Sequence, residues 1–329
     1  MDLDWRCFRR LFEALDDYHD DADGRRRYLD GQRRTVAAHV AELAPLRTRE
    51  RVPVDDEHLW RLMKLYALSR VGDYLIELFC PAGAPPSGFG VTGGRAVTPG
   101  SVTHRTRPSG ISGSPGRIEP RTLDPDGRAV HTDFLTGIGL TPFEHAEGFS
   151  PFHHEIFAVV QDPAATCVTL EEVLWPGFWF GDLLFSRAGV RVRAPRHLID
   201  AEVATSSTLY FTYCREPRPA EDLSHGWGTA SQWRTTFQRF YSDEDGLHFN
   251  WDGAVDIGED PPAGHPDEID DPDPLDERRE LLLHRCFVRG NPPFDEDDRF
   301  PFDDRLTLTT AEWPLRPDSI VHVPRPQKQ

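Results

Sequence analysis

The chain has 329 residues, of which 38% are apolar and 28% are charged, and its formal net charge is −18. This composition is typical of a soluble globular protein, and it excludes a fibrous or largely disordered chain. The excess of negative charge also argues against binding to nucleic acids or anionic membranes, because both attract clustered positive charge.

Sequence features that would direct the chain to a membrane or an oxidising compartment are missing. No stretch reaches the ~18–20 consecutive apolar residues of a transmembrane helix. The first ten residues, MDLDWRCFRR, lack the basic and apolar regions of a secretory signal. The cysteines include no CxxC pair, which argues against a thiolate zinc site. We therefore expect a cytosolic protein.

Residues 1–80 are predicted to form a small helical bundle segment. Apolar residues recur there at spacings of three and four, as on the buried face of a helix. The spacing predicts helices over about 5–15 and 25–43, and a third helix that starts after Pro53 and runs up to Cys80. Asp4 and Asp55 are placed to cap the first and third of them.

Residues 81–130 are predicted to be a flexible linker or long loop. Glycine, proline and serine occupy 23 of these 50 positions, and large apolar residues are few. Such a segment buries too little surface to offset the entropy lost on ordering. It is therefore the best candidate boundary in the chain.

Residues 131–329 are predicted to form an α+β main domain. Short runs rich in β-branched and aromatic residues predict strands over 154–160, 168–174, 178–185, 190–194, 208–214 and 306–313. We expect these strands to form a mostly antiparallel sheet joined by hairpins. Flanking helices are predicted over 231–241 and 276–289. The fold class is thus α+β, with a helical segment, a linker and a sheet domain in that order.

Residues 131–155 are dense in side chains that can bind a metal. They include His131, Asp133, Glu144, His145, His153, His154 and Glu155. In a strand, His153 and Glu155 would point to one face, where they could hold a divalent metal ion together with a distant His225 or His248. The order His154-Glu155 starts like a zinc-protease motif, but Ala158 stands where its second histidine belongs. Surface and hydrogen-bonded core histidines are the alternative.

Two aromatic clusters could line a pocket for a small molecule. One runs from Trp175 to Asp182 and holds four tryptophan and phenylalanine residues; the other surrounds Trp227. Here His225 could act as an acid or base, and Arg234 could fix a carboxylate or phosphate. We therefore predict Asp182, His225 and Arg234 as catalytic residues. The alternative is a core hinge in which the aromatic rings only fill volume.

Residues 251–304 carry most of the negative charge of the chain, with 18 acidic residues against five arginines. Such runs are usually solvated loops. The sharper interpretation is an acidic surface that docks on a basic protein partner.

These observations leave three hypotheses. In the one that the sequence slightly favours, the protein binds and inhibits a cationic partner through its acidic C-terminal surface, as an immunity-type inhibitor would. In the second, it is a small-molecule or metal-dependent enzyme with a His/Glu/Arg pocket within 131–250. In the third, it is a scaffold without a pocket.

Overall fold

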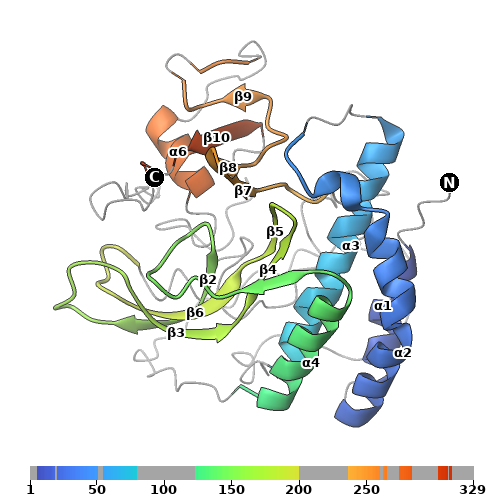
Figure 1. Ribbon diagram of the computed structural model, residues 1–329. Coiled ribbons are helices and arrows are strands. Elements are labelled where there is room, and N and C mark those ends of the chain that lie inside the picture. Colours follow the sequence, from blue (N-terminus) through green and yellow to red (C-terminus); the bar gives the residue numbers. More distant parts are fainter. Residues whose placement is uncertain are drawn as a thin grey trace, which may run out of the picture.

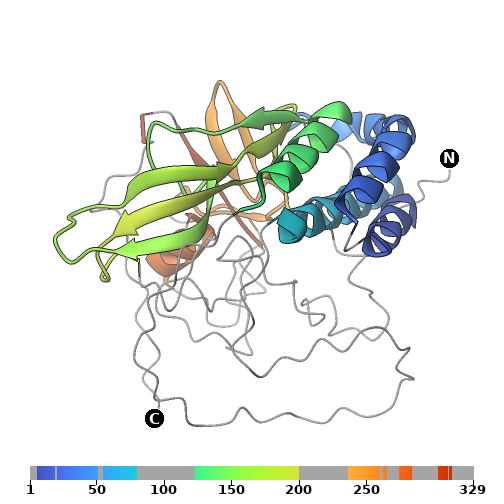
Figure 2. The same cartoon turned by 90° about the horizontal axis from the view of Figure 1, so that it is seen from below.

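The computed structural model describes residues 6–18, 21–50, 55–79, 123–199, 236–259, 262–264, 274–283, 303–309 and 311–312. Helices come first along the chain and two β-sheets follow, so the protein belongs to the α+β class, as predicted. The first four α-helices gather on one side of the molecule and the strands on the other (Figure 1). The view from below shows the same two layers (Figure 2).

The three N-terminal α-helices agree closely with the apolar periodicity of the sequence. The helices are α1 (Arg6–Asp16), α2 (Ala22–Ala41), the 3-10 helix η1 (Ala44–Leu46), α3 (Asp56–Phe79), α4 (Pro125–Gly137) and α6 (Leu275–Leu283). The predicted cap of α3 is confirmed, because Asp55 Oδ1 accepts the His58 backbone N–H at 2.7 Å. In the same way, Asp21 caps α2 by accepting the Gly24 N–H.

Helix α4 begins within the range that the sequence assigned to the linker. Asp124 caps it and Pro125 opens it, which is a favourable start for a helix. The helix then packs against α2 and α3 and buries Phe134 and Leu135. Residues 80–122, where the rest of the predicted linker falls, lie outside the described residues.

Ten strands form two sheets within the described part of the chain. They are β1 (Thr141–Phe143), β2 (His154–Gln161), β3 (Thr169–Trp175), β4 (Gly177–Phe180), β5 (Leu183–Ser186), β6 (Ala188–Ala194), β7 (Tyr241–Asp243), β8 (Gly246–Phe249), β9 (Val255–Asp256) and β10 (Asp304–Leu308). The larger sheet has the order β1-β4-β5-β7-β8-β10-β9, and the smaller one has the order β2-β6-β3. The predicted strand 208–214 lies outside the described residues.

Most strand pairs are antiparallel, as predicted, but the strands are divided between two sheets and two of the pairs are parallel. Strand β2 pairs in parallel with β6, and β9 pairs in parallel with β10. The chain between β2 and β6 passes through three other strands before it returns, so a direct hairpin does not set their direction. The alternation predicted for residues 190–193 is confirmed, since Val190 and Val192 are buried and Arg191 and Arg193 are not.

The strand predicted over 178–185 is in fact the hairpin of β4 and β5. Gly181 lies at its turn with φ +63°, a conformation that favours glycine. A Cβ atom at Gly181 would lie 2.7 Å from the carbonyl oxygen of Arg47. The backbone of the helical layer thus approaches the hairpin too closely for a side chain.

The helix predicted over 231–241 is wrong from residue 236 onward, where the structure describes the segment. The Phe237 N–H donates to Leu62 O at 3.3 Å, and Phe240 O accepts the Leu184 N–H at 2.8 Å. The backbone therefore bonds to α3 and β5 and not to its own next turn. The aromatic residues that suggested one helix face pack in two different hydrophobic clusters. Phe237 packs with the helices, and Phe240 packs with β8.

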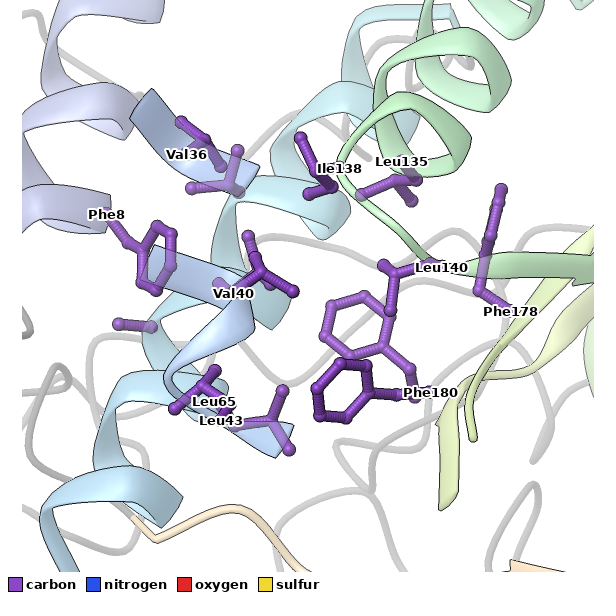
Figure 3. Packing of buried hydrophobic residues seen from close by; sticks show 14 of the residues in the cluster. Phe8, Val36, Val40, Leu43, Leu65, Leu135, Ile138, Leu140, Phe178 and Phe180 are labelled. Carbon is purple, nitrogen blue, oxygen red and sulfur yellow. The ribbon is translucent and has the colours of Figure 1, made fainter. Parts of the chain in front are cut away.

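The helical layer and the larger sheet share one hydrophobic core. Figure 3 shows side chains of the helices, such as Val40 and Leu135, meeting Phe178 and Phe180 of β4. A second cluster lies under β8 and β10 and includes Leu282 of α6. The N-terminal helices are therefore packed on the sheet domain.

Candidate active site

A row of three side chains crosses the larger sheet on strands β7, β8 and β10. Tyr241 is the register partner of His248, and His248 is the register partner of Thr307. Partners in register project from the same face of a sheet. Asp243 lies two residues beyond Tyr241 on β7 and so projects from that face too.

The His248 ring links a hydroxyl group to a carboxylate. Its Nδ1 lies 3.0 Å from Thr307 Oγ1, and its Nε2 lies 2.8 Å from Asp243 Oδ1. An ionised carboxylate can only accept, so Nε2–H donates to Asp243. Nδ1 is then left to accept the hydroxyl proton of Thr307. Thr307, His248 and Asp243 form a hydrogen-bond chain that we name the relay.

Burial changes along the relay from one end to the other. His248 has no exposed surface, and the Asp243 side chain is 15% exposed. Thr307 is exposed at the other end. The hydroxyl group of an exposed threonine is therefore connected to an imidazole that solvent does not reach.

Arg49 contacts the Asp243 end of the relay from the helical layer. Its Nε lies 2.5 Å from Asp243 Oδ2, and its guanidinium group also pairs with Asp245. The same guanidinium lies over the Trp251 ring, 5.7 Å from the centroid. The Trp251 ring in turn meets His248 edge-on, with centroids 5.6 Å apart.

A buried arginine with an ion-pair partner lies beside the relay, at the junction of the sheet and the helices. Arg239, which is 3% exposed, forms a paired ion contact with Asp252 and donates to the Tyr241 hydroxyl at 3.1 Å. That hydroxyl donates to Leu46 O at 2.9 Å. Burial raises the pKa of Tyr241 to about 12, so the phenol stays protonated at neutral pH.

His58 is a buried histidine next to the same charges. It is 1% exposed, and neither ring nitrogen has a hydrogen-bond partner. Burial lowers its pKa, and the positive charge of Arg239 lowers it further. The ring is therefore neutral at pH 7.

Two of the predicted metal ligands, His153 and Glu155, flank His154, the first residue of β2, where a different group of histidines meets. Both residues are buried. Ser150 Oγ lies 2.7 Å from His153 Nδ1, and the His145 ring is stacked on the His153 ring at 4.0 Å. Burial lowers the pKa of His153 to about 2, with further lowering by His145. His153 is thus neutral and closely packed.

His154 has partners at both ring nitrogens. Its Nδ1 accepts the Ser150 backbone N–H at 3.0 Å, and its Nε2 lies 3.1 Å from Glu144 O. Since a carbonyl oxygen only accepts, the proton is on Nε2. Burial lowers the pKa of His154 to about 4. This ring fixes the loop between β1 and β2 and has no free nitrogen for a ligand.

Within the ranges that the structure describes, no three His, Cys, Asp or Glu side chains lie close enough together to hold a metal ion. Stacked rings such as those of His145 and His153 direct their nitrogen lone pairs in parallel planes, which do not meet at one ion. His248, the third predicted ligand, uses both ring nitrogens in the relay. His225 lies outside the described residues, so the predicted divalent metal site stays a prediction.

Of the predicted catalytic residues, Asp182 is described and His225 and Arg234 are not. Asp182 is exposed at the turn between β4 and β5. Its backbone N–H donates to Arg47 O at 2.8 Å, and its carbonyl accepts the Ser242 N–H at 3.0 Å. The described contacts of Asp182 are therefore those of a turn, and the predicted pocket stays a prediction.

Sequence reasoning selected His248 but missed the partners that surround it. The dipeptide Asp245-Gly246 is a hairpin signal, and it would have paired Asp243 with the strand of His248. Thr307 is 59 residues away from His248 along the chain, and Arg49 is still more distant. No local pattern connects these two residues to the histidine.

Comparisons with known proteins give no match from which the role of these residues could be inferred. No family model, no curated protein and no solved structure matches the chain. In the described part of the chain, none of the helices has both the length and the apolar character needed to cross a membrane.

Proposed function

We propose that the chain is an enzyme that transfers acyl groups, with Thr307 as its nucleophile. The observation that carries the proposal is the relay, in which the hydroxyl group of an exposed threonine is hydrogen-bonded to a buried imidazole held by a carboxylate. Hydroxyl, imidazole and carboxylate in this order are the groups that activate serine and threonine nucleophiles. The substrate class is an ester, thioester or activated amide.

Each group in the relay has a defined task in this reaction. Thr307 Oγ1 attacks the carbonyl carbon of the substrate while its proton passes to His248 Nδ1. Asp243 stabilises the imidazolium that forms and keeps Nε2 protonated. His248 then gives its proton to the leaving group, and an ester of Thr307 remains. Water attacks this ester with His248 as the base, which releases the acid and restores the hydroxyl group.

Exposure distinguishes this relay from a second hydroxyl–histidine pair among the described residues. Ser150 and His153 lie at a shorter distance, 2.7 Å, but Ser150 is only 2% exposed. A substrate cannot reach a buried hydroxyl without a change in the fold. Thr307 is exposed, and it has the imidazole behind it.

The test is covalent labelling of the purified full chain with a β-lactone, an electrophile that acylates reactive hydroxyl groups. We expect one added acyl group on the peptide that contains Thr307, detected by mass spectrometry. Thr307→Ser should still be labelled, whereas Thr307→Val and His248→Gln should not. Thr309→Val is the matched control, since Thr309 is exposed on the same strand end and bonds to Glu312 and not to a histidine. Labelling of the Thr307→Val variant at the wild-type rate would refute the proposal.

The second candidate is the binding function that the acidic segment 251–304 suggests. The net negative charge of this segment favours a basic protein as the partner. Among the described acids of the segment, three already pair with arginines inside the fold, in the pairs Asp252–Arg239, Asp256–Arg305 and Asp304–Arg278. Less of the charge is therefore available to a partner than the sequence suggested, so we rank this function second.

The binding function requires a purified partner whose affinity falls as salt increases. A candidate captured from the host at low salt would be purified and titrated by calorimetry at two salt concentrations. Salt-independent binding, or no binding by the purified candidate, would contradict it.

A further inference from the structure

We propose that Arg49 is the positioning residue of the relay, and that the helical layer thereby completes a site on the C-terminal sheet. This inference rests on the proposed function, because it names a further part of the same site. Arg49 follows η1 in the connection from α2 to α3, far in sequence from the three relay residues. It does not touch the reacting hydroxyl group.

The geometry divides the Asp243 carboxylate between two partners. Oδ1 faces His248 Nε2 at 2.8 Å, and Oδ2 faces Arg49 Nε at 2.5 Å. A carboxylate on a short side chain can rotate about its terminal bond. With Arg49 on one oxygen, the other oxygen stays directed at the histidine, so the imidazole keeps the tautomer whose Nδ1 can accept the Thr307 proton.

Arg49 is itself fixed by three groups on the sheet side. Its guanidinium bridges Asp243 and Asp245 and lies over the Trp251 ring. A planar guanidinium suits such a position better than a lysine ammonium, because it can contact two carboxylates and an aromatic face together. The ring of contacts from Asp243 to Arg49, Trp251 and His248 then closes on itself.

The backbone around Arg49 is also attached to the sheet. Leu46 O accepts the Tyr241 hydroxyl, and Arg47 O accepts the Asp182 N–H. The Arg47 guanidinium lies over the Phe180 ring at 4.7 Å. These contacts hold the segment 46–49 at a fixed place on the sheet, so the position of Arg49 follows from the packing of the two layers.

The test compares Arg49→Gln and Arg49→Lys with the wild type. The first readout is the tautomer of His248, observed by nitrogen NMR of the histidine rings. The second is the rate of β-lactone labelling at Thr307. We expect the Nε2–H tautomer to lose population in Arg49→Gln and the labelling rate to fall by about 10²-fold, the cost of a misplacement near 1 Å. Arg49→Lys should recover only part of both.

Controls separate positioning from a general loss of structure. Arg9→Gln removes an exposed ion pair with Glu13 on α1 and should change neither readout. Asp245→Asn removes the outer partner of Arg49 and should lower the labelling rate less than Arg49→Gln. All variants are compared by thermal unfolding, so that loss of labelling in a folded variant can be recognised.

The outcomes distinguish this inference from the proposed function. An unchanged His248 tautomer and an unchanged labelling rate in Arg49→Gln would overturn the role of Arg49 while leaving the nucleophile in place. If the wild type is not labelled at all, the proposed function fails, and the tautomer measurement still decides whether Arg49 orients Asp243.

Discussion

The imidazole rings of His145 and His153 lie face to face, with centroids 4.0 Å apart and planes within 10° of each other. Two imidazolium ions at this distance would repel strongly, and burial already disfavours charge on His153. The pKa of His153 is lowered to about 2 by burial first and by His145 next. The pair therefore requires both rings to be neutral.

This requirement predicts loss of stability in acid. The pKa of His153 is about 2 in the folded protein and 6.5 without the fold, so between these values the unfolded chain binds the extra proton. The free energy of unfolding must then fall as the pH drops from 6.5 towards 2. His153 alone should cost about 2 kcal/mol between pH 7 and pH 5. Urea unfolding of the wild type and of His153→Gln at both pH values measures the difference, and equal losses in the two proteins would contradict it.

His145 has an unusual backbone conformation that gives a second prediction. Its φ is +50°, a region that residues with a side chain populate at a cost of about 1–2 kcal/mol. Replacement by glycine removes this cost, whereas replacement by alanine keeps it. His145→Gly should therefore be more stable than His145→Ala by about 1 kcal/mol. Both variants lose the stacked ring, so their difference in urea unfolding isolates the backbone term, and equal stabilities would show that the position is unstrained.

His131 is a third buried histidine, but its environment is apolar. Its ring lies between Phe79 and Phe178, at 5.5 and 5.4 Å between centroids, and neither ring nitrogen has a partner. Burial lowers its pKa from 6.5 to about 3, so its protonation also opposes folding as the pH falls through this window.

His131→Leu should be more stable than the wild type at pH 7 by about 1 kcal/mol, because it removes buried polar atoms that have no partner. It should also lose about 2 kcal/mol less between pH 7 and pH 5. His131→Gln is the matched variant, since it keeps a polar group but cannot titrate. It should share the weaker pH dependence without the gain at pH 7. A Leu variant with the pH dependence of the wild type would refute the assignment.

Much of the secondary structure could be predicted from the sequence, because helices and strands impose their periods locally. The three N-terminal helices and the alternation around Val190 follow from such periods. The failures occur where tertiary contacts override them. Phe237 and Phe240 have helical spacing, yet each enters a different core from a segment that is not helical. A periodic pattern cannot distinguish one apolar face from two separate contacts.

The candidate site was less predictable than the fold. His248 attracted notice as a polar residue at strand spacing, but its function depends on Thr307 and Arg49, which come from distant segments. Their proximity results from the pairing of β8 with β10 and from the packing of the α2–α3 connection on the sheet. Neither is encoded in a short motif. A single sequence can therefore suggest one member of such a site and leave its partners unidentified.

The turn between β7 and β8 sets the register that brings Asp243 to His248, and Gly246 is the first residue of β8 after that turn. Gly246 has φ +142°, and a Cβ atom there would lie 2.1 Å from Leu308 O on β10. Alanine at this position requires either the turn or strand β10 to move, and β10 carries Thr307. Gly246→Ala should therefore destabilise the protein by about 3 kcal/mol and lower labelling at Thr307.

Gly31 offers the matched control for this prediction. It lies within α2, and a Cβ atom there would meet nothing within 4 Å. Gly31→Ala should raise the stability by up to about 1 kcal/mol, because alanine is the better helix former. Both substitutions add one methyl group to a glycine, so opposite shifts of the urea midpoint would identify the close approach to β10 as the cause. If Gly246→Ala unfolded at the same urea concentration as the wild type, β10 would have to be free to move, and the fixed geometry on which the relay depends would be excluded.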